Sequence, residues 1–91
     1  MEHVTTAYLA EKVNGKLIGP DREISGIFNF LHDAKEGDAV IRHRIDEKGI
    51  EIAASKGVSC LVTQNPHEKA IETAKKLEFP LIVTERIELA N

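Results

Sequence analysis

The chain has few aromatic residues, one cysteine and no long hydrophobic segment. It contains no tryptophan, one tyrosine and three phenylalanines, too few for a sheet that stacks RNA bases. A single cysteine excludes a disulfide within the chain, and because Cys60 lies in an apolar run we expect it to be a buried thiol. No apolar run approaches the roughly 20 residues that cross a bilayer. We therefore predict no membrane partner.

The chain also lacks a large excess of either positive or negative charge. The net charge is -3 at pH 7, and the only basic cluster, Arg42-His43-Arg44, has acidic residues on both sides. A nucleic-acid surface normally carries an extended basic patch, so we predict no nucleic-acid partner. The segment Met1–Val4 lacks the basic-then-apolar order of a secretory signal, which predicts a cytoplasmic location.

Motifs that carry chemistry by themselves are missing as well. The sequence has no P-loop, no GxGxxG and no GxSxG, and nothing pairs a nucleophile with a base. Its histidines lack the spacing of metal ligands. We therefore predict no catalytic residue, no metal and no cofactor in this chain. The histidines are His3, His32, His43 and His67.

The hydrophobic pattern that is present predicts an α/β domain. A leading helix over 7–13 ends at Asn14-Gly15, and short extended segments over 16–18 and 24–28 follow it. Helices then alternate with buried strands, which implies right-handed crossovers and a mostly parallel sheet. We predict one small three-layer domain, residues 1–91, with a β-α-β-α-β core. The three core strands are expected at Ala39–Ile41, Val58–Thr63 and Leu81–Val83.

Both core helices have recognisable start signals. Asp46 is expected to cap a helix that runs to about Lys56 and ends at Gly57. In the next helix Asn65 is expected as the cap, with Pro66 in the first position. The core-facing residues are expected to be Ile45, Gly49, Ile52 and Ala53 in the first helix, and Ala70, Ala74 and Leu77 in the second.

The two strand-to-helix connections are the candidate binding sites. Open α/β sheets bind ligands at the carboxyl ends of their strands, and guanidinium groups hold phosphates or carboxylates well. An alternative interpretation is that these are solvated connections, whose cations pair with nearby acids and whose polar residues serve only to cap a helix. The candidate ligand-binding residues are Asn29, Arg42, His43, Arg44, Thr63 and Gln64.

Several short motifs occur in a familiar order. "G-K-L-I-G" spans 15–19, and Gly37-Asp38 precedes a strand. A helix ending Ala53-Ala54-Ser55-Lys56-Gly57-Val58 leads to Leu61-Val62-Thr63, and "P-L-I-V" closes the pattern at Pro80–Val83. From about Ala7 to Thr84 this order resembles the N-terminal domain of Mur ligases, which holds their nucleotide-linked substrate. It also resembles the DRTGG domain, which is akin in fold to the N-terminal domain of HPr kinase.

The chain departs from both families at characteristic motifs, including the name-giving motif of DRTGG domains. Phe28-Asn29-Phe30 stands where Mur ligases carry a Ser-Arg pair. Thr63-Gln64-Asn65 replaces the Thr-Gly-Gly of DRTGG domains, and Glu85-Arg86-Ile87 replaces their D-T-F. A Mur-like ligase with a non-murein substrate, such as the amide-forming ligases of tetrapyrrole coenzyme synthesis, fits the missing Ser-Arg pair. Such a piece lacks the ATP-binding domain and does not catalyse alone.

Two functional hypotheses follow. The first is a non-catalytic small-molecule-binding or regulatory domain for an anionic ligand, either nucleotide-linked or carboxylate-rich. Within a longer chain it would serve an ATP-dependent Mur-like amide ligase. The second is a protein-protein interaction module, with a second copy or a neighbouring catalytic domain as partner. Glu85–Asn91 reads as the opening of another helix, so the chain is expected to be either a piece of a longer protein or a domain with a frayed end.

Overall fold

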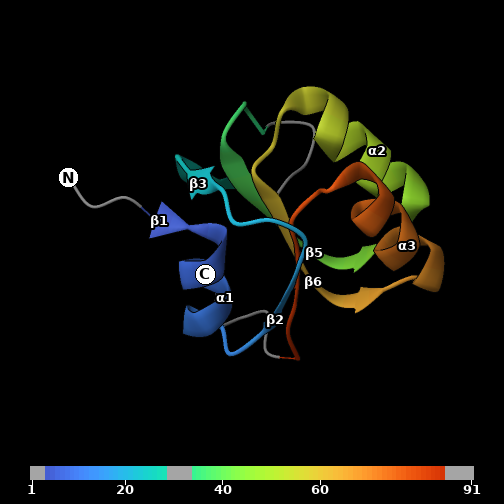
Figure 1. The fold of residues 1–91 in the computed structure, drawn as a ribbon, viewed down its shortest axis with the longest axis horizontal. Helices are drawn as coiled ribbons and strands as arrows, with labels where there is room; N and C mark the ends of the chain where they lie inside the picture. The colour runs from blue at the N-terminus through green and yellow to red at the C-terminus, as the bar shows by residue number, and fades with distance from the viewer. Residues whose placement is uncertain (1–3, 29–33, 86–91) are drawn as a thin grey trace.

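A five-stranded sheet lies at the centre of the molecule (Figure 1). The computed structural model describes residues 4–28 and 34–85, and every count of helices or strands below refers to those residues. Four strands of the sheet run parallel, and β2 joins one edge in the antiparallel sense. The small α/β domain with a mostly parallel sheet that the sequence predicts is thus confirmed. The strands, in spatial order, are β2 (Lys16–Ile18), β7 (Leu81–Val83), β6 (Cys60–Pro66), β5 (Asp38–Ile45) and β4 (Gly26–Phe28).

Three helices in the described part of the chain cover the two faces of this sheet (Figure 1). They are α1 (Thr6–Lys12), α2 (Glu47–Lys56) and α3 (Glu68–Leu77). Because side chains alternate along a strand, Ile41 and Val62 pack with α1, whereas Val40 and Leu61 pack with α2 and α3. No helix among these three is long and apolar enough to cross a membrane.

The start and stop signals of α2 are confirmed. The Asp46 carboxylate accepts a hydrogen bond from the Gly49 backbone N–H at 2.8 Å, so it caps the helix. Gly57 ends the helix in the left-handed conformation, at φ 77°. Asn14, after α1, is left-handed as well, at φ 55°. Each of these signals acts within one turn of chain, which is why sequence alone reveals it.

The predicted cap of α3 is wrong. His67 is the cap, and its Nδ1 accepts a hydrogen bond from the Lys69 N–H at 3.2 Å. Asn65 and Pro66 instead belong to β6, whose pairing with β5 extends to Ile45 opposite Pro66. The ladder continues one step further, where the His67 N–H donates to the Ile45 carbonyl at 2.9 Å. Pairing with a distant strand thus overrides the local helix-start signal.

Two residues expected in the core are exposed. Ile52 is 39 % exposed and Leu77 is 44 % exposed, whereas Ile50 is fully buried. Ile50 and Ile52 lie about 200° apart around the helix, so both cannot face the sheet. Ala53, close to the Ile50 side of α2, is buried together with it. The buried face of α2 therefore contains Ile50 and Ala53, and Ile52 lies outside it.

The predicted strand over 24–28 is two strands in two sheets. Glu23–Ile24 forms β3 and pairs antiparallel with β1 (Val4–Thr5), whereas Gly26–Phe28 forms β4 of the main sheet. Ser25 separates them, and its N–H donates to the Gly37 carbonyl at 2.7 Å. Alternate residues of this segment differ little in polarity, so the sequence pattern does not indicate the break at Ser25.

Candidate functional site

A cavity of about 740 Å³ opens where β5 and β6 end and α2 and α3 begin. Its size suits a small organic molecule rather than a single ion. The carboxyl ends of parallel strands are where open α/β sheets bind ligands. The lining consists of three cationic side chains, one carboxylate, several apolar residues and two further polar side chains: Arg42, Arg44, Ile45, Asp46, Lys48, Gly49, Ile52, Asn65, Pro66 and His67.

The floor of the cavity is formed by an extension of the sheet. β5 runs to Ile45, so Arg42, His43 and Arg44 lie within a strand and not in the predicted loop. β5 and β6 run side by side as far as Ile45 and Pro66 (Figure 1). The backbone that carries both arginines is therefore held by hydrogen bonds to β6.

Strand alternation divides the predicted site residues between two faces. Arg42 and Arg44 share one face of β5 and line the cavity together. His43 points to the opposite face, where its Nδ1 lies 3.3 Å from Oε1 of Gln64. Gln64 also donates from Nε2 to the Glu85 carbonyl at 3.0 Å. Of the predicted site residues, the cavity therefore brings together Arg42 and Arg44 but not His43 and Gln64, because neighbours in a strand face opposite ways.

Thr63 is not among the residues that line the cavity. Thr63 is fully buried, and its hydroxyl donates to the His43 carbonyl at 3.1 Å, so it holds the β5–β6 pair together. Asn29 lies outside the described residues, as does most of the helix expected over 85–91.

The cations of the cavity have no acidic partner among residues 4–28 and 34–85. Neither Arg42, Arg44 nor Lys48 forms an ion pair with a described carboxylate. The Asp46 carboxylate is bonded to the Gly49 N–H at 2.8 Å. The buried Asp38 carboxylate accepts from the Lys35 N–H at 2.7 Å, at the far end of β5. The alternative of cations paired with nearby acids therefore finds no support in this part of the chain.

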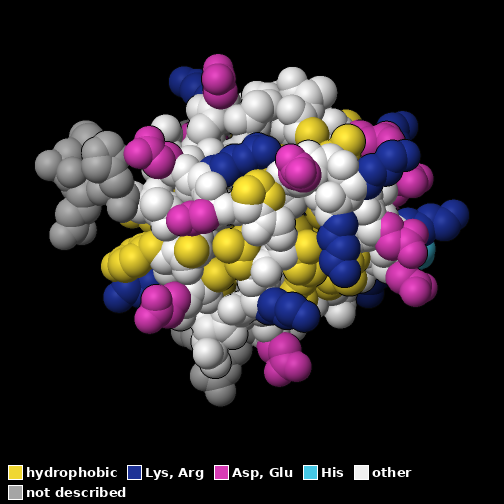
Figure 2. All heavy atoms as spheres, in the orientation of Figure 1, with side chains coloured by type: hydrophobic (Ala, Val, Ile, Leu, Met, Phe, Trp, Pro, Cys, Tyr) yellow, Lys and Arg dark blue, Asp and Glu magenta, His cyan; other side chains and the backbone are white. Residues whose placement is uncertain are grey.

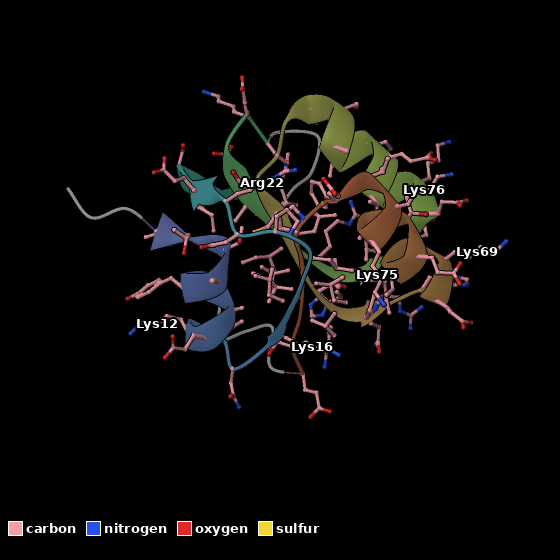
Figure 3. The ribbon with its side chains drawn as sticks, viewed as in Figure 1. Lys12, Lys16, Arg22, Lys69, Lys75 and Lys76 are labelled. Atoms are coloured by element: carbon pink, nitrogen blue, oxygen red, sulfur yellow. The ribbon has the colours of Figure 1, made fainter. Side chains whose placement is uncertain are left out.

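Other cations of the molecule are dispersed. Figure 3 shows Lys12 and Lys16 near α1 and β2, away from Lys69 and Lys76 on α3. The face in Figure 2 likewise shows basic and acidic side chains interspersed. Lys12 lies 5.4 Å from the centroid of the Tyr8 ring. The grouping of three cations around one cavity is thus a local feature.

Sequence reasoning missed several lining residues. Lys48 follows the correctly predicted cap Asp46 within the first helical turn, so its position could have been derived. Asn65 and His67 reach the cavity only because β6 extends past Thr63, which no local signal reveals. Since His67 Nδ1 accepts a hydrogen bond from Lys69, Nε2 is the protonated nitrogen of the neutral ring and can donate to a ligand.

Two similar strand-helix units carry different residues at the positions of the two arginines. α2 and α3 begin with the same pattern, E-K-x-I-E-x-A, at 47–53 and 68–74. The strands that precede them pair in register, with Arg42 opposite Thr63 and Arg44 opposite Asn65. One strand-helix unit therefore folds with neutral residues where the other has guanidinium groups. The charges of Arg42 and Arg44 are available for a role other than folding.

Nucleophilic or metal chemistry finds little basis in the described residues. Burial raises the pKa of the Cys60 thiol to about 12, so it is protonated at neutral pH, and it packs on the α1 face away from the cavity. No group of three His, Cys, Asp or Glu side chains within 4–28 and 34–85 could hold a metal ion.

No protein-family model matches this sequence, and a search of curated proteins finds no match either.

Proposed function

We propose that this chain is a binding or regulatory domain that holds an anionic small molecule in the cavity at the ends of β5 and β6. The observation that carries the proposal is the convergence of Arg42, Arg44 and Lys48 on one cavity, with no ion pair to a described carboxylate. Like charges held close together repel each other, and a bound anion removes that cost. Guanidinium groups also offer paired donors to a carboxylate or phosphate.

The chemistry of the lining favours holding a ligand over transforming it. Guanidinium, ammonium, amide and imidazole groups bind and orient an anion. The one carboxylate of the lining, Asp46, is engaged as a helix cap. We therefore propose a domain without catalytic residues of its own, located in the cytoplasm.

The resemblance to Mur ligase N-terminal domains and DRTGG domains is part of this proposal. It rests on the order of the short motifs and on the leading helix and strand before the parallel core. A substrate-holding role of that kind would make the chain one part of an ATP-dependent amide ligase, with the nucleotide chemistry supplied by another domain.

Titration of the protein with anions tests the proposed function. Isothermal calorimetry would compare the wild type with the double variant Arg42→Ala/Arg44→Ala, using inorganic phosphate, uridine monophosphate and terephthalate as probes. Loss of two charge-assisted interactions should weaken binding by at least roughly a hundredfold. Unchanged affinity for every anion that binds would overturn the proposal.

Lys48 and Lys69 form a matched pair for this test. They occupy equivalent positions in the shared pattern, but only Lys48 lines the cavity. Figure 3 shows Lys69 pointing away from the molecule. Lys48→Ala should weaken anion binding several-fold while Lys69→Ala leaves it unchanged, and circular dichroism would establish that both variants are folded.

Exposed apolar side chains favour a second candidate, an interaction module. Ile52 on α2 and Leu77 on α3 are 39 % and 44 % exposed, on the helical side of the molecule. A self-association that covered them would remove apolar surface from water. Light scattering over a range of protein concentrations would reveal a dimer, and Leu77→Ser should dissociate it. A monomer at every concentration contradicts self-association.

A further inference from the structure

The two arginines of the cavity lie at a fixed backbone spacing on β5. Arg42 and Arg44 are alternate residues on one face of β5, so their Cα atoms lie roughly 6.6 to 6.8 Å apart along the strand. The hydrogen-bonded register with Thr63 and Asn65 of β6 fixes that separation. Each planar guanidinium can hold one carboxylate through two parallel hydrogen bonds. Two such groups at a fixed spacing match two separate anionic groups on one ligand.

At the start of each helix beside the cavity, one backbone N–H is already hydrogen-bonded to a side chain and is not free for a phosphate. Phosphate sites at the starts of helices use unoccupied backbone N–H groups. At α2 the Gly49 N–H is bonded to Asp46, and at α3 the Lys69 N–H is bonded to His67 Nδ1. The Asp46 carboxylate also belongs to the lining, and it repels a doubly charged phosphate more than a singly charged carboxylate.

Apolar groups occupy much of the remaining wall. Ile45, Ile52 and Pro66 line the cavity, and Gly49 presents no side chain there. Ile52 remains 39 % exposed, so part of its apolar surface is in contact with water. An apolar ligand surface placed against it would be stabilised because both surfaces are removed from water. A cavity of about 740 Å³ has room for such a body between the charged groups.

We infer that the cavity selects an organic dicarboxylate, in which a rigid apolar body separates two carboxylates. This inference rests on the proposed function, that the cavity binds an anion. One carboxylate pairs with Arg42 and the other with Arg44, while the body packs against Ile52 and Pro66. Lys48 adds a further positive charge. The requirement for two anionic groups distinguishes such a ligand from inorganic phosphate and from a monocarboxylate.

Three probes test the inference by calorimetry on the intact chain. Terephthalate carries two carboxylates on a benzene ring, benzoate carries one, and inorganic phosphate lacks the apolar body. Terephthalate should bind at least roughly tenfold more tightly than benzoate or phosphate, because only it forms both bidentate pairs. Arg44→Lys keeps the positive charge but removes the planar guanidinium group, which can form two parallel hydrogen bonds with one carboxylate. It should reduce the preference for terephthalate over benzoate to within about threefold.

A substitution in the apolar wall provides a second, independent test of the inference. Ile52→Ser should weaken terephthalate binding several-fold and leave phosphate binding unchanged, and because Ile52 is exposed the fold should tolerate it. Equal affinities for terephthalate and benzoate, or tighter binding of phosphate, would overturn the dicarboxylate inference and leave the proposed function standing. If none of the three probes binds, the dicarboxylate inference is overturned, and the titration with uridine monophosphate then decides the proposed function.

Discussion

Single side chains in this protein serve two purposes, and Asp46 is the clearest example. Its carboxylate caps α2 through the Gly49 N–H and also lines the cavity beside Lys48. A negative charge at a helix N-terminus stabilises the helix. The same charge lowers the positive potential that an anionic ligand would experience. Stability and ligand affinity therefore place opposite demands on this residue.

Replacing Asp46 should separate the two effects. Asp46→Ala is expected to lower the free energy of unfolding by about 1 kcal/mol, because the cap is lost. Asp46→Ser keeps a capping oxygen and should remain close to wild-type stability. Both variants should bind terephthalate more tightly than the wild type, since both remove the negative charge. Urea unfolding and calorimetry measure the two quantities, and weaker binding by the serine variant would contradict this view of the cavity.

Asp21 gives the protein an acid-sensitive contact. The Ala7 N–H, which donates to the carboxylate at 2.9 Å, holds the pKa of Asp21 below its usual value, and the Thr6 hydroxyl assists at 3.0 Å. Because the folded-state pKa is depressed, the stabilisation is complete above the unfolded-state pKa. It is lost as the pH falls through the folded-state pKa.

The Asp21→Asn variant tests this linkage. The amide oxygen can still accept from Ala7 but carries no charge. The variant should unfold more easily than the wild type at pH 7, and the difference should shrink as the pH is lowered below about 4. Thermal midpoints measured from pH 7 to pH 2 would show this convergence. A constant difference over the whole range would mean that the charge of Asp21 has no part in it.

At the scale of elements, α2 and α3 end alike with different residues. Gly57 and Glu78 both close their helix in the left-handed conformation, at φ 77° and φ 54°. Glycine adopts this conformation without steric cost, whereas for other residues it costs roughly 1 to 2 kcal/mol. Glu78 is exposed and hydrogen-bonds through its carbonyl to Arg22, a contact that does not need its side chain.

Substitutions at these two C-terminal caps should change the free energy of unfolding in opposite directions. Glu78→Gly is expected to raise the free energy of unfolding by up to about 1 kcal/mol, because it relieves the left-handed strain. Gly57→Ala is expected to lower it by about the same amount. Denaturant titration of the two variants beside the wild type measures both. A stability loss in Glu78→Gly would show that the glutamate side chain makes a compensating contribution.

The ends of the helices and the ends of the strands differ in how well the sequence predicts them. The cap of α2 at Asp46 and its end at Gly57 were predictable, because both depend on contacts within one turn. The ends of β5 and β6 were not, since each strand extends as far as its partner allows. For the site this distinction is decisive: Arg42 and Arg44 were predicted and share the cavity, but Asn65 and His67 join them only through the extended pairing.

At the scale of the whole molecule, two apolar clusters sandwich the sheet. Cys60 belongs to the cluster beneath α1, next to Ile82 and Val62, and is fully buried. Because it lies in a central strand, we expect that no small local opening exposes it. With a pKa of about 12, only about one thiol in ten thousand is ionised at pH 8 even before access is considered.

Thiol labelling should therefore report global unfolding. A thiol-specific reagent at pH 8 is expected to modify native protein slowly, at a rate that scales with the unfolded fraction, and denatured protein rapidly. Ile82→Ala, which removes part of the same cluster, should accelerate labelling strongly because it costs about 2 to 5 kcal/mol. Tyr8→Ala, at an exposed position of α1, serves as the control. Rapid labelling of the native wild type would mean that β6 opens locally.

The sequence by itself determined the α/β class, the mostly parallel sheet, the α2 boundaries and the presence of two arginines near the end of a core strand. These features depend on periodicity and on capping, which act between residues close in the chain. Only the tertiary structure decided how far β5 and β6 extend, and that His67 and not Asn65 caps α3. It also placed His43 and Gln64 on the opposite face from the cavity. Hydrogen bonds to a distant partner decide how far a strand extends, and its extent in turn decides which residues alternate between its two faces. A local sequence pattern does not show where that pairing ends.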